Sequence, residues 1–314
     1  MNSKNKPINQ GTDNCNSIFQ REWWLEAVAP GQWDILKVES GGKVIANMPI
    51  VASTAFGLTL IRMPPLTYCL GPWLAENSVS NTKRFSNQIK RIDALLDQVP
   101  NCHYFSQNLH YSIENSLPFK WRGYDTQVLH TYCIENLDNM DNVWSDFKGS
   151  TRTEIKKARN IVTIRSDLEI EVVWKLCSMS FDRTGRKPAY DFELLKRVDS
   201  ACKANNACKT FFAEDSSGEI LGAVYIVFDQ NSAYYLMGGT HPSARGGGIN
   251  QLLLHEAISY AATQTNRFDF FGCNIKSFEF FKRNFGGNLK THYSIRRSKL
   301  STKFLKRVAS RGLR

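Results

Sequence analysis

Between residues 232 and 271, apolar and polar positions alternate in a way that predicts a strand, a glycine-rich loop, a helix and a second strand. Residues 232–237 form a short apolar run that suits a buried strand. Glycines follow, and the apolar positions of residues 249–261 then recur with a helical period of about 3.6 residues. Residues 267–271 are again mostly apolar, so the pattern closes with another strand.

The first part of the chain also contains both kinds of element. Helices are predicted at 17–28 and 81–98, the second with Phe85, Ile89, Ile92, Leu95 and Leu96 on its core side. A Ser40-Gly41-Gly42 turn between alternating segments predicts a hairpin, and further strands are expected at 101–105 and 127–134. The proline-punctuated, aromatic segment 63–73 is either packed scaffold or the lining of a groove.

The later part repeats this mixture. Helices are predicted at 140–148, 150–159, 168–179 and 191–205, and strands at 162–165, 209–214 and 220–229. Runs of strands and helices that do not alternate strictly indicate an α+β fold.

The amino-acid composition limits the classes of protein to which the chain can belong. The chain has 314 residues, of which 42% are hydrophobic, so it can bury one large core or two medium cores. Its eight cysteines contain no C-x-x-C pair, which favours buried thiols in a reducing compartment. Its six histidines form no recognisable ligand set, so we expect no metal. No signal core or membrane-spanning run is found, and we expect a cytoplasmic protein.

The positive charge is concentrated at the C-terminus. The net charge is +11, and residues 291–314 contribute eight Lys or Arg and no acid, which leaves 11 − 8 = +3 for the rest. Apolar residues of the tail fall on one side of a predicted helix and cations on the other. Residues 298–314 are therefore expected to contact an anionic inner membrane, and the alternative is an exposed terminal helix.

The glycine-rich loop has the outline of a phosphate cradle. Glycines let backbone N–H groups approach a phosphate, and the following helix N-terminus adds partial positive charge. Arg245 could add a bidentate contact. A loop that merely turns the chain is the alternative. The spacing fits neither a Walker A loop nor a dinucleotide fingerprint.

The sequence resembles the GNAT acyltransferases and, more closely, their Fem-type branch. The segments that carry the resemblance are Trp121-Arg122-Gly123-Tyr124, Thr131-Tyr132, Arg152-x-x-Ile155-x-Lys157-Ala158, Ala213-Glu214-Asp215, Ala223-Val224-Tyr225-Ile226, Tyr234-Tyr235-Leu236-Met237-Gly238-Gly239, Phe268-Asp269-Phe270 and Phe280-Phe281-Lys282-Arg283-Asn284-Phe285-Gly286-Gly287. The resemblance implies two tandem GNAT-like domains, each a mixed, mostly antiparallel sheet flanked by helices.

The expected boundaries follow from the resemblance and the predicted elements. A disordered N-terminus (1–16) precedes an N-terminal GNAT-like domain (17–135). A helical connector (136–160) leads to the C-terminal acyltransferase domain (161–297) and the basic tail (298–314).

The resemblance leaves two activities and one inactive role open. Relatives in surface-polysaccharide gene clusters look like N-acyltransferases that use acyl-CoA, usually acetyl-CoA, on amino sugars, free or lipid-linked. Fem proteins proper move amino acids from aminoacyl-tRNA onto peptidoglycan precursors. We expect the first activity, because no long helical arm for tRNA is inserted in the second domain and the Arg-Gly-Gly-Gly loop suits a pyrophosphate. A non-catalytic binding module is the third possibility.

The GNAT scheme implies where the chemistry lies. Adjacent parallel strands separate at their ends, here between the strand ending at 237–238 and the strand 268–271, and a backbone N–H near Gly238 binds the thioester carbonyl. Asp269 and Glu214 are the candidate bases, and Tyr235 is the candidate acid. The expected acyl-CoA contacts are Gly238, Gly239, Arg245, Gly246, Gly247, Gly248 and Asn250. The expected acceptor contacts are Asp182, which is also a possible base, Arg183, Arg186 and Tyr190.

Each of these residues also has a plain structural interpretation. Asp269 could cap a turn, Glu214 could belong to an exposed hairpin, and Tyr235 could be core. Asp182 and the neighbouring arginines could be a solvated loop.

Overall fold

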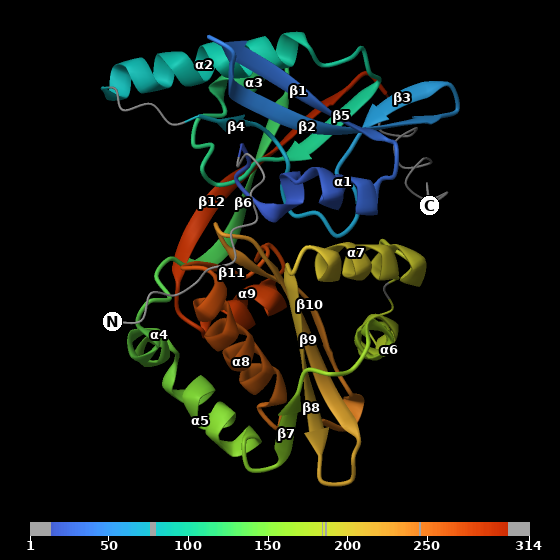
Figure 1. The fold of residues 1–314 in the computed structure, drawn as a ribbon, viewed down its shortest axis with the longest axis vertical. Helices are drawn as coiled ribbons and strands as arrows, with labels where there is room; N and C mark the ends of the chain where they lie inside the picture. The colour runs from blue at the N-terminus through green and yellow to red at the C-terminus, as the bar shows by residue number, and fades with distance from the viewer. Residues whose placement is uncertain (1–13, 76–79, 184, 186, 245, 301–314) are drawn as a thin grey trace. The chain divides into compact units, whose positions relative to one another are not determined.

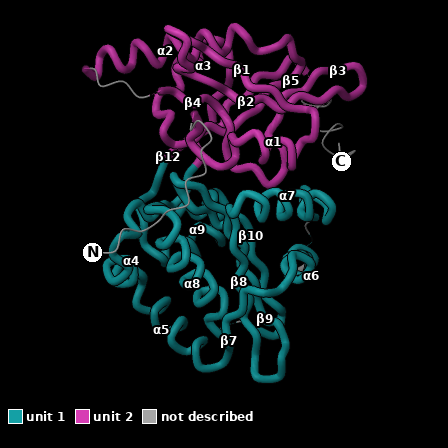
Figure 2. The backbone as a smooth tube through the Cα atoms, in the orientation of Figure 1, with its two compact units in different colours: residues 1–9, 130–290 teal, residues 10–129, 291–314 magenta. Residues whose placement is uncertain are grey.

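The computed structural model describes residues 14–75, 80–183, 185, 187–244 and 246–300, with no side chain described for Arg183. The chain forms two compact units, coloured separately in Figure 2. The central unit comprises residues 130–290, and the N-terminal unit comprises the described residues up to 129 together with 291–300. Arg245, Arg186 and the tail from 301 onward lie outside the described residues, so the predictions made for them stay predictions.

The N-terminal unit is a mixed sheet with the strand order β1-β2-β3-β5-β12, and β4 pairs with β2 (Figure 1). Its strands are β1 (Trp33–Ser40), β2 (Lys43–Ala55), β3 (Leu58–Ile61), β4 (Trp73–Leu74), β5 (Tyr104–Asn108) and β12 (Asn288–Ser298). Its helices are η1 (Ile18–Gln20), α1 (Glu22–Val28), α2 (Asn81–Asp97) and α3 (Leu117–Trp121). Only β3 and β5 run parallel among the described pairs of this unit.

Helix α2 covers this sheet with the C-terminal half of its apolar stripe. Ile92, Leu95 and Leu96 are buried in the core with Met48 and Phe105, as the period predicts. Phe85 was expected on the same side, but 38% of it is exposed, because the first turns of α2 extend past the core. The helix therefore begins as a solvent-facing segment and ends as a buried one.

The strands of the central unit follow the order β6-β11-β10-β9-β8-β7 and form a mixed part of the same 12-stranded sheet. Its strands are β6 (Asp125–Ile134), β7 (Val162–Arg165), β8 (Cys208–Asp215), β9 (Ile220–Phe228), β10 (Ala233–Thr240) and β11 (Phe268–Asp269). Its helices are α4 (Met140–Asp146), α5 (Gly149–Ala158), α6 (Ile170–Arg183), α7 (Phe192–Ala204), η2 (Pro242–Ala244), α8 (Ile249–Gln264) and α9 (Lys276–Arg283). The α+β class and the tandem mixed sheets flanked by helices are thus confirmed.

Helices pack on both faces of the central sheet. Helix α8 lies against β9, where a Cβ on Gly222 would come within 2.9 Å of Leu253. Helix α6 lies on the opposite face against β10, where a Cβ on Gly239 would come within 2.4 Å of the Leu176 backbone. Figure 1 shows the two helices on either side of the sheet.

The compact units divide the chain differently from the expected domain boundaries. The expected connector 136–160 contributes Val143, Phe147 and Ile155 to the core of the central unit, because the apolar faces of α4 and α5 are buried there. The end of the expected C-terminal domain belongs to the N-terminal unit, since residues 294–298 of β12 pair with β5 and Ile295 joins its core.

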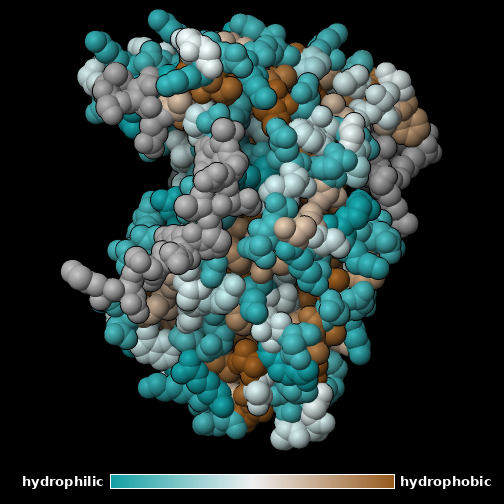
Figure 3. Space-filling model, in the orientation of Figure 1, coloured by the Kyte–Doolittle hydropathy of each residue, from teal (hydrophilic) through white to brown (hydrophobic). Residues whose placement is uncertain are grey.

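The described surface gives no sign of a membrane-crossing segment. No helix within the described residues is both long and apolar enough to traverse a bilayer. The face drawn in Figure 3 is mostly hydrophilic, and its apolar areas are small and interrupted by polar residues.

Candidate active site

Strands β10 and β11 run parallel for only two residue pairs and then separate. The pairs are Ala233↔Phe268 and Tyr234↔Asp269, whereas β10 continues to Thr240 beside β9. After Asp269 the chain follows β6, because Phe270 N–H donates to the Tyr132 carbonyl and Cys273 N–H donates to the His130 carbonyl. The structure therefore has the separation that the sequence predicted, and beyond residue 234 the edge of β10 pairs with no described strand on the β11 side. We call the region between this edge and the turn at 269–272 the opening.

A bulge in β10 turns a backbone amide into this opening. Ala233 N–H points toward the β11 side, where it donates to the Arg267 carbonyl. N–H directions alternate along a strand, and the register shift between Tyr235 and Met237 inserts one extra residue. The alternation then directs the Gly238 N–H toward the opening.

Tyr235 lies beside that amide. A Cβ on Gly238 would come within 2.5 Å of the Tyr235 hydroxyl, so glycine leaves room for this phenol. Burial, with a smaller contribution from Cys177, raises the pKa of Tyr235. The phenol therefore stays protonated at neutral pH and can donate a hydrogen bond.

Asp269 is fully buried at the base of the opening and has two different oxygens. Its Oδ1 accepts hydrogen bonds from the Thr131 hydroxyl at 2.6 Å and from the Phe271 N–H at 2.8 Å. Its Oδ2 is buried with no partner among the described residues. Burial raises the pKa of Asp269 to about 6, against the hydrogen bonds and the charge of Lys282 that lower it. One oxygen thus caps a turn, and the other is left for a further role.

The turn after Asp269 is held from several directions. Phe271 and Gly272 have positive φ angles of 60° and 80°, a strained conformation for Phe271. Gly272 N–H donates to the Thr131 hydroxyl, and Lys282 Nζ donates to the Gly272 carbonyl at 2.6 Å. Asp269, Thr131 and Lys282 therefore fix residues 269–272 as one unit.

Lys282 is the site residue that the sequence analysis missed. Only 6% of it is exposed, and its Nζ lies 5.7 Å from the centroid of the Tyr235 ring. Burial lowers the pKa of Lys282 to about 8, and Asp269 partly offsets this effect. A lysine between Phe281 and Phe285, on a short helix rich in phenylalanine, was the available signal.

The glycine loop has structural as well as open positions. Gly248 has a φ of 72°, and a Cβ there would come within 2.3 Å of the Glu154 carbonyl oxygen on α5. Gly239 is likewise required by the close approach of α6. Gly246, with a φ of 78°, has no atom within 4 Å of its Cβ position, and Gly247 makes only ordinary contacts. The open part of the predicted cradle is therefore Gly246–Gly247 and the start of α8.

Asn250 connects this loop to the end of β10. Its Oδ1 accepts a hydrogen bond from the Thr240 hydroxyl at 2.6 Å. Thr240 lies two residues beyond Gly238 on the same strand. The N-terminus of α8 is therefore held next to the far end of the opening.

Glu214 is not brought to this site. In the sheet register, Asp269 aligns with Tyr234, Val227 and Cys208, and Glu214 lies six residues along β8 from Cys208. At about 3.3 Å per residue this is roughly 20 Å. Its carboxylate instead forms an ion pair with Arg165 at 2.9 Å, which fits the hairpin interpretation.

Tyr190 is the described acceptor candidate that contacts a site strand. Its hydroxyl lies 3.8 Å from the Met237 sulfur, and its ring packs on Trp174. Asp182 is exposed at the end of α6, which extends further than predicted. The side chains of Arg183 and Arg186 lie outside the described atoms.

Within the described residues, no group of three or more His, Cys, Asp or Glu side chains is placed to hold a metal ion. The charged groups of the site are instead one carboxyl and one amine, both buried.

Comparison with known proteins finds a family that matches the part of the chain containing this site. The acetyltransferase (GNAT) domain family matches residues 145–283, which contain the opening, Asp269 and Lys282. The crystal structure of FemX matches with 14% identity and a TM-score of 0.69, covering 97% of this chain and 96% of that one.

Two further structures have the same fold. L-PGS from Bacillus licheniformis matches with 15% identity and a TM-score of 0.52, over 90% of both chains. A tandem GNAT protein from the clavulanic acid biosynthesis pathway matches with 9% identity and a TM-score of 0.51, over 87% of this chain and 86% of that one. No curated protein matches the chain. Residues 145–283 are therefore similar to the acetyltransferase (GNAT) domain family, and the chain as a whole has the same fold as FemX and the tandem GNAT protein.

Proposed function

We propose that the chain is an N-acyltransferase that moves an acyl group, acetyl in the first instance, from acyl-CoA to an amine acceptor. The proposed acceptor is an amino sugar of a cell-surface polysaccharide precursor. The observation that carries the proposal is the opening between β10 and the 269–272 turn, where Gly238, Tyr235 and Lys282 meet.

The opening suits a thioester. The Gly238 N–H can bind the carbonyl oxygen as negative charge develops on it, and one such donor is worth about 3 kcal/mol. The edge of β10 that pairs with no described strand beyond residue 234 offers further backbone groups to the amide-containing arm of coenzyme A. Its phosphates would lie at Gly246–Gly247 and the N-terminus of α8, which Asn250 holds beside Thr240.

The ionisable groups suit aminolysis. A lysine-like amine costs about 4–5 kcal/mol to deprotonate at pH 7, so a base is valuable. The acceptor nitrogen attacks the carbonyl carbon, the C–N bond forms and the amine proton passes to Asp269. The C–S bond then breaks, and Tyr235 protonates the departing thiolate. Lys282, mostly protonated at pH 7, stabilises negative charge in the opening and on Asp269.

The donor is tested by binding and turnover together. Acetyl-CoA should raise the melting temperature of the full-length protein in proportion to ln(1 + [L]/Kd), and thiol release should depend on an added amino sugar. Arg245→Ala should raise KM for acetyl-CoA much more than for the acceptor. Retention of alanyl-tRNA without any effect of acetyl-CoA would instead assign the aminoacyl-tRNA donor. Failure of both donors would identify a binding module.

A further inference from the structure

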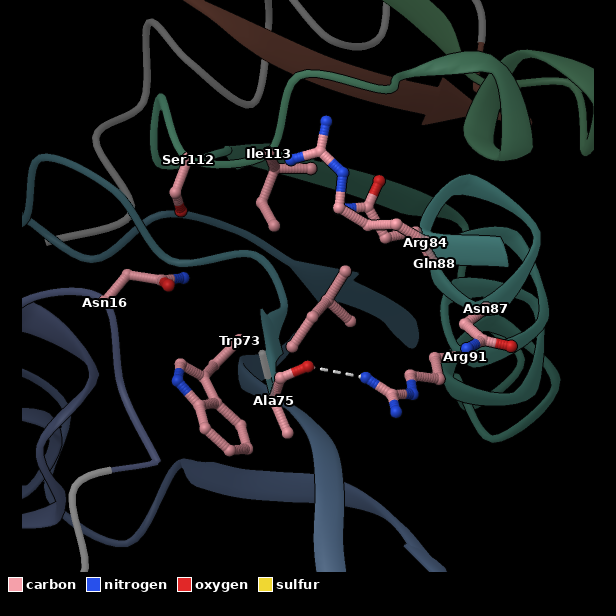
Figure 4. A pocket seen from close by; sticks show the side chains of 10 residues that line it. Asn16, Trp73, Ala75, Arg84, Asn87, Gln88, Arg91, Ser112 and Ile113 are labelled. Carbon is pink, nitrogen blue, oxygen red and sulfur yellow. Dashed lines mark hydrogen bonds between the residues drawn. The ribbon is translucent and has the colours of Figure 1, made fainter. Parts of the chain in front are cut away.

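The N-terminal unit contains a cavity that the proposed reaction does not use. It has a volume of about 400 Å³, within the usual range for small-molecule sites. Helix α2 forms one wall, and the end of β4, with Trp73, forms the facing wall (Figure 4). All its described lining residues belong to the N-terminal unit.

One face of α2 supplies the polar side of this cavity. Arg84, Asn87, Gln88 and Arg91 occupy positions i, i+3, i+4 and i+7, which fall on a single helix face. The same stripe continues into the core, because the buried Leu95 lies four residues after Arg91. Two guanidiniums and two amides therefore face one hollow.

The charge of the cavity is positive. None of its described lining residues is acidic. The exposed Arg84 side chain has no hydrogen bond or ion pair recorded with another described residue, and its guanidinium lies over the ring of Phe85, 4.8 Å from the centroid. Arg91 has a structural contact as well, because its guanidinium donates to the Ala75 carbonyl at 2.7 Å. Arg84 is thus the cation best placed to bind an incoming anion.

The opposite wall is aromatic. Trp73 is half-buried and stands across the hollow from the arginines in Figure 4. An indole beside hydrogen-bonding amides is suited to the face of a sugar ring, and a guanidinium is suited to a phosphate.

We infer that this cavity binds a sugar phosphate, with Arg84 on the phosphate, Trp73 on the ring and Gln88 on the hydroxyls. The choice of a sugar rests on the proposed function, whereas the anion contact rests on the cavity alone. The cavity would hold the phosphate-bearing part of the glycan acceptor or a separate sugar phosphate.

The test is calorimetric titration of the full-length protein with N-acetylglucosamine 1-phosphate, N-acetylglucosamine and inorganic phosphate. We expect the sugar phosphate to bind at least about tenfold more tightly than either part alone. Arg84→Gln should weaken it by about tenfold or more, and Trp73→Phe should weaken it less. Lys90→Gln, an exposed change on the same helix outside the cavity, is the matched control and should have no effect.

The outcomes separate this inference from the proposed function. Undetectable binding, equal affinity in Arg84→Gln, or equal affinity for inorganic phosphate would overturn the sugar-phosphate site. Arg84→Gln should also leave the acetyl-CoA affinity unchanged, and a loss of that affinity would contradict a separate site. Sugar-phosphate binding without any acetyl-CoA binding would keep the inference and remove the proposed donor.

Discussion

Each unit contains a short parallel pairing of two strands, which we call a parallel junction, but the residues at the two junctions differ. In the central unit β10 and β11 pair at two positions and separate, and in the N-terminal unit β3 and β5 pair at Leu60↔Tyr104 and Ile61↔Phe105. Asp269 and Phe105 hold corresponding places, the second residue of each short parallel pairing. One is a buried carboxyl and the other is a buried phenyl ring.

The space beyond the junction differs as well. In the N-terminal unit, the segment around Leu70 runs beside the end of β5, with Leu70 N–H donating to the Asn108 carbonyl. A Cβ on Gly71 would come within 2.7 Å of Leu109, so this segment fills the space tightly. The same fold therefore supplies an opening only where no chain segment occupies it, and the ionisable residues are found at the open junction.

Replacing Lys282 would remove the cation from the open junction and has the largest expected effect. Lys282→Met should lower kcat by about 10²–10³-fold, the range for loss of one charge-stabilising donor. The protein should still fold, because methionine is apolar and fills a buried place, but it should lose some stability with the hydrogen bonds from Lys282 to the Phe271 and Gly272 carbonyls. Steady-state kinetics measures kcat, and thermal melting measures whether the variant is folded. The exposed Lys276→Met substitution on the same helix is the control.

Replacing Asp269 with an uncharged residue would remove the carboxyl that distinguishes the junction of the central unit from that of the N-terminal unit. Asp269→Asn keeps the acceptor oxygen that caps the turn and should lower kcat by about 10²-fold through loss of the base. The wild-type kcat/KM profile should rise near pH 6, as Asp269 ionises, and fall near pH 8, as Lys282 deprotonates. The variant should lose the acid limb only. Persistence of that limb would show that another group titrates there.

Substitution of Gly239 tests how closely α6 packs against β10 in the central unit. Gly239→Ala should reduce the free energy of unfolding by about 1–3 kcal/mol, because the Cβ meets the α6 backbone. Gly246→Ala, with open space but a positive φ, should cost about 1 kcal/mol and act mainly on the affinity for acetyl-CoA. Urea unfolding of both variants would compare them, and equal losses would contradict the packing argument.

Glu214 has the smallest expected effect. Glu214→Gln removes a partly exposed ion pair with Arg165 and should change stability by less than about 1 kcal/mol. Acyl transfer should be unaffected, since the carboxylate lies far along β8 from the opening. A large loss of kcat would restore Glu214 as a candidate base.

The sequence was informative where the site is built from consecutive strand residues. Tyr235, Gly238 and Asp269 could be grouped because two recognisable strands carry them, but the bulge that directs the Gly238 N–H was not predicted. Lys282 was missed because its burial depends on the turn at 271–272, which hydrogen bonds to it from outside its own helix.

At two glycines and at Glu214, the sequence alone could not predict the surroundings of the residue. Gly239 and Gly248 were predicted to face a ligand, but helices α6 and α5 take the space beside them, a contact that local sequence does not encode. Glu214 lies next to a predicted hairpin turn, yet only the register of four strands shows how far it is from Asp269.

Strand β12 has a practical consequence for dissecting the chain. It begins in the central unit, and its residues 294–298 complete the sheet of the other unit beside β5. A stop codon before residue 291 would thus damage a domain encoded almost 200 positions earlier, and deletions of the basic terminus need to end beyond Ser298. Residues 130–290, by contrast, are one uninterrupted stretch of the chain, although β6 begins five residues before it at Asp125.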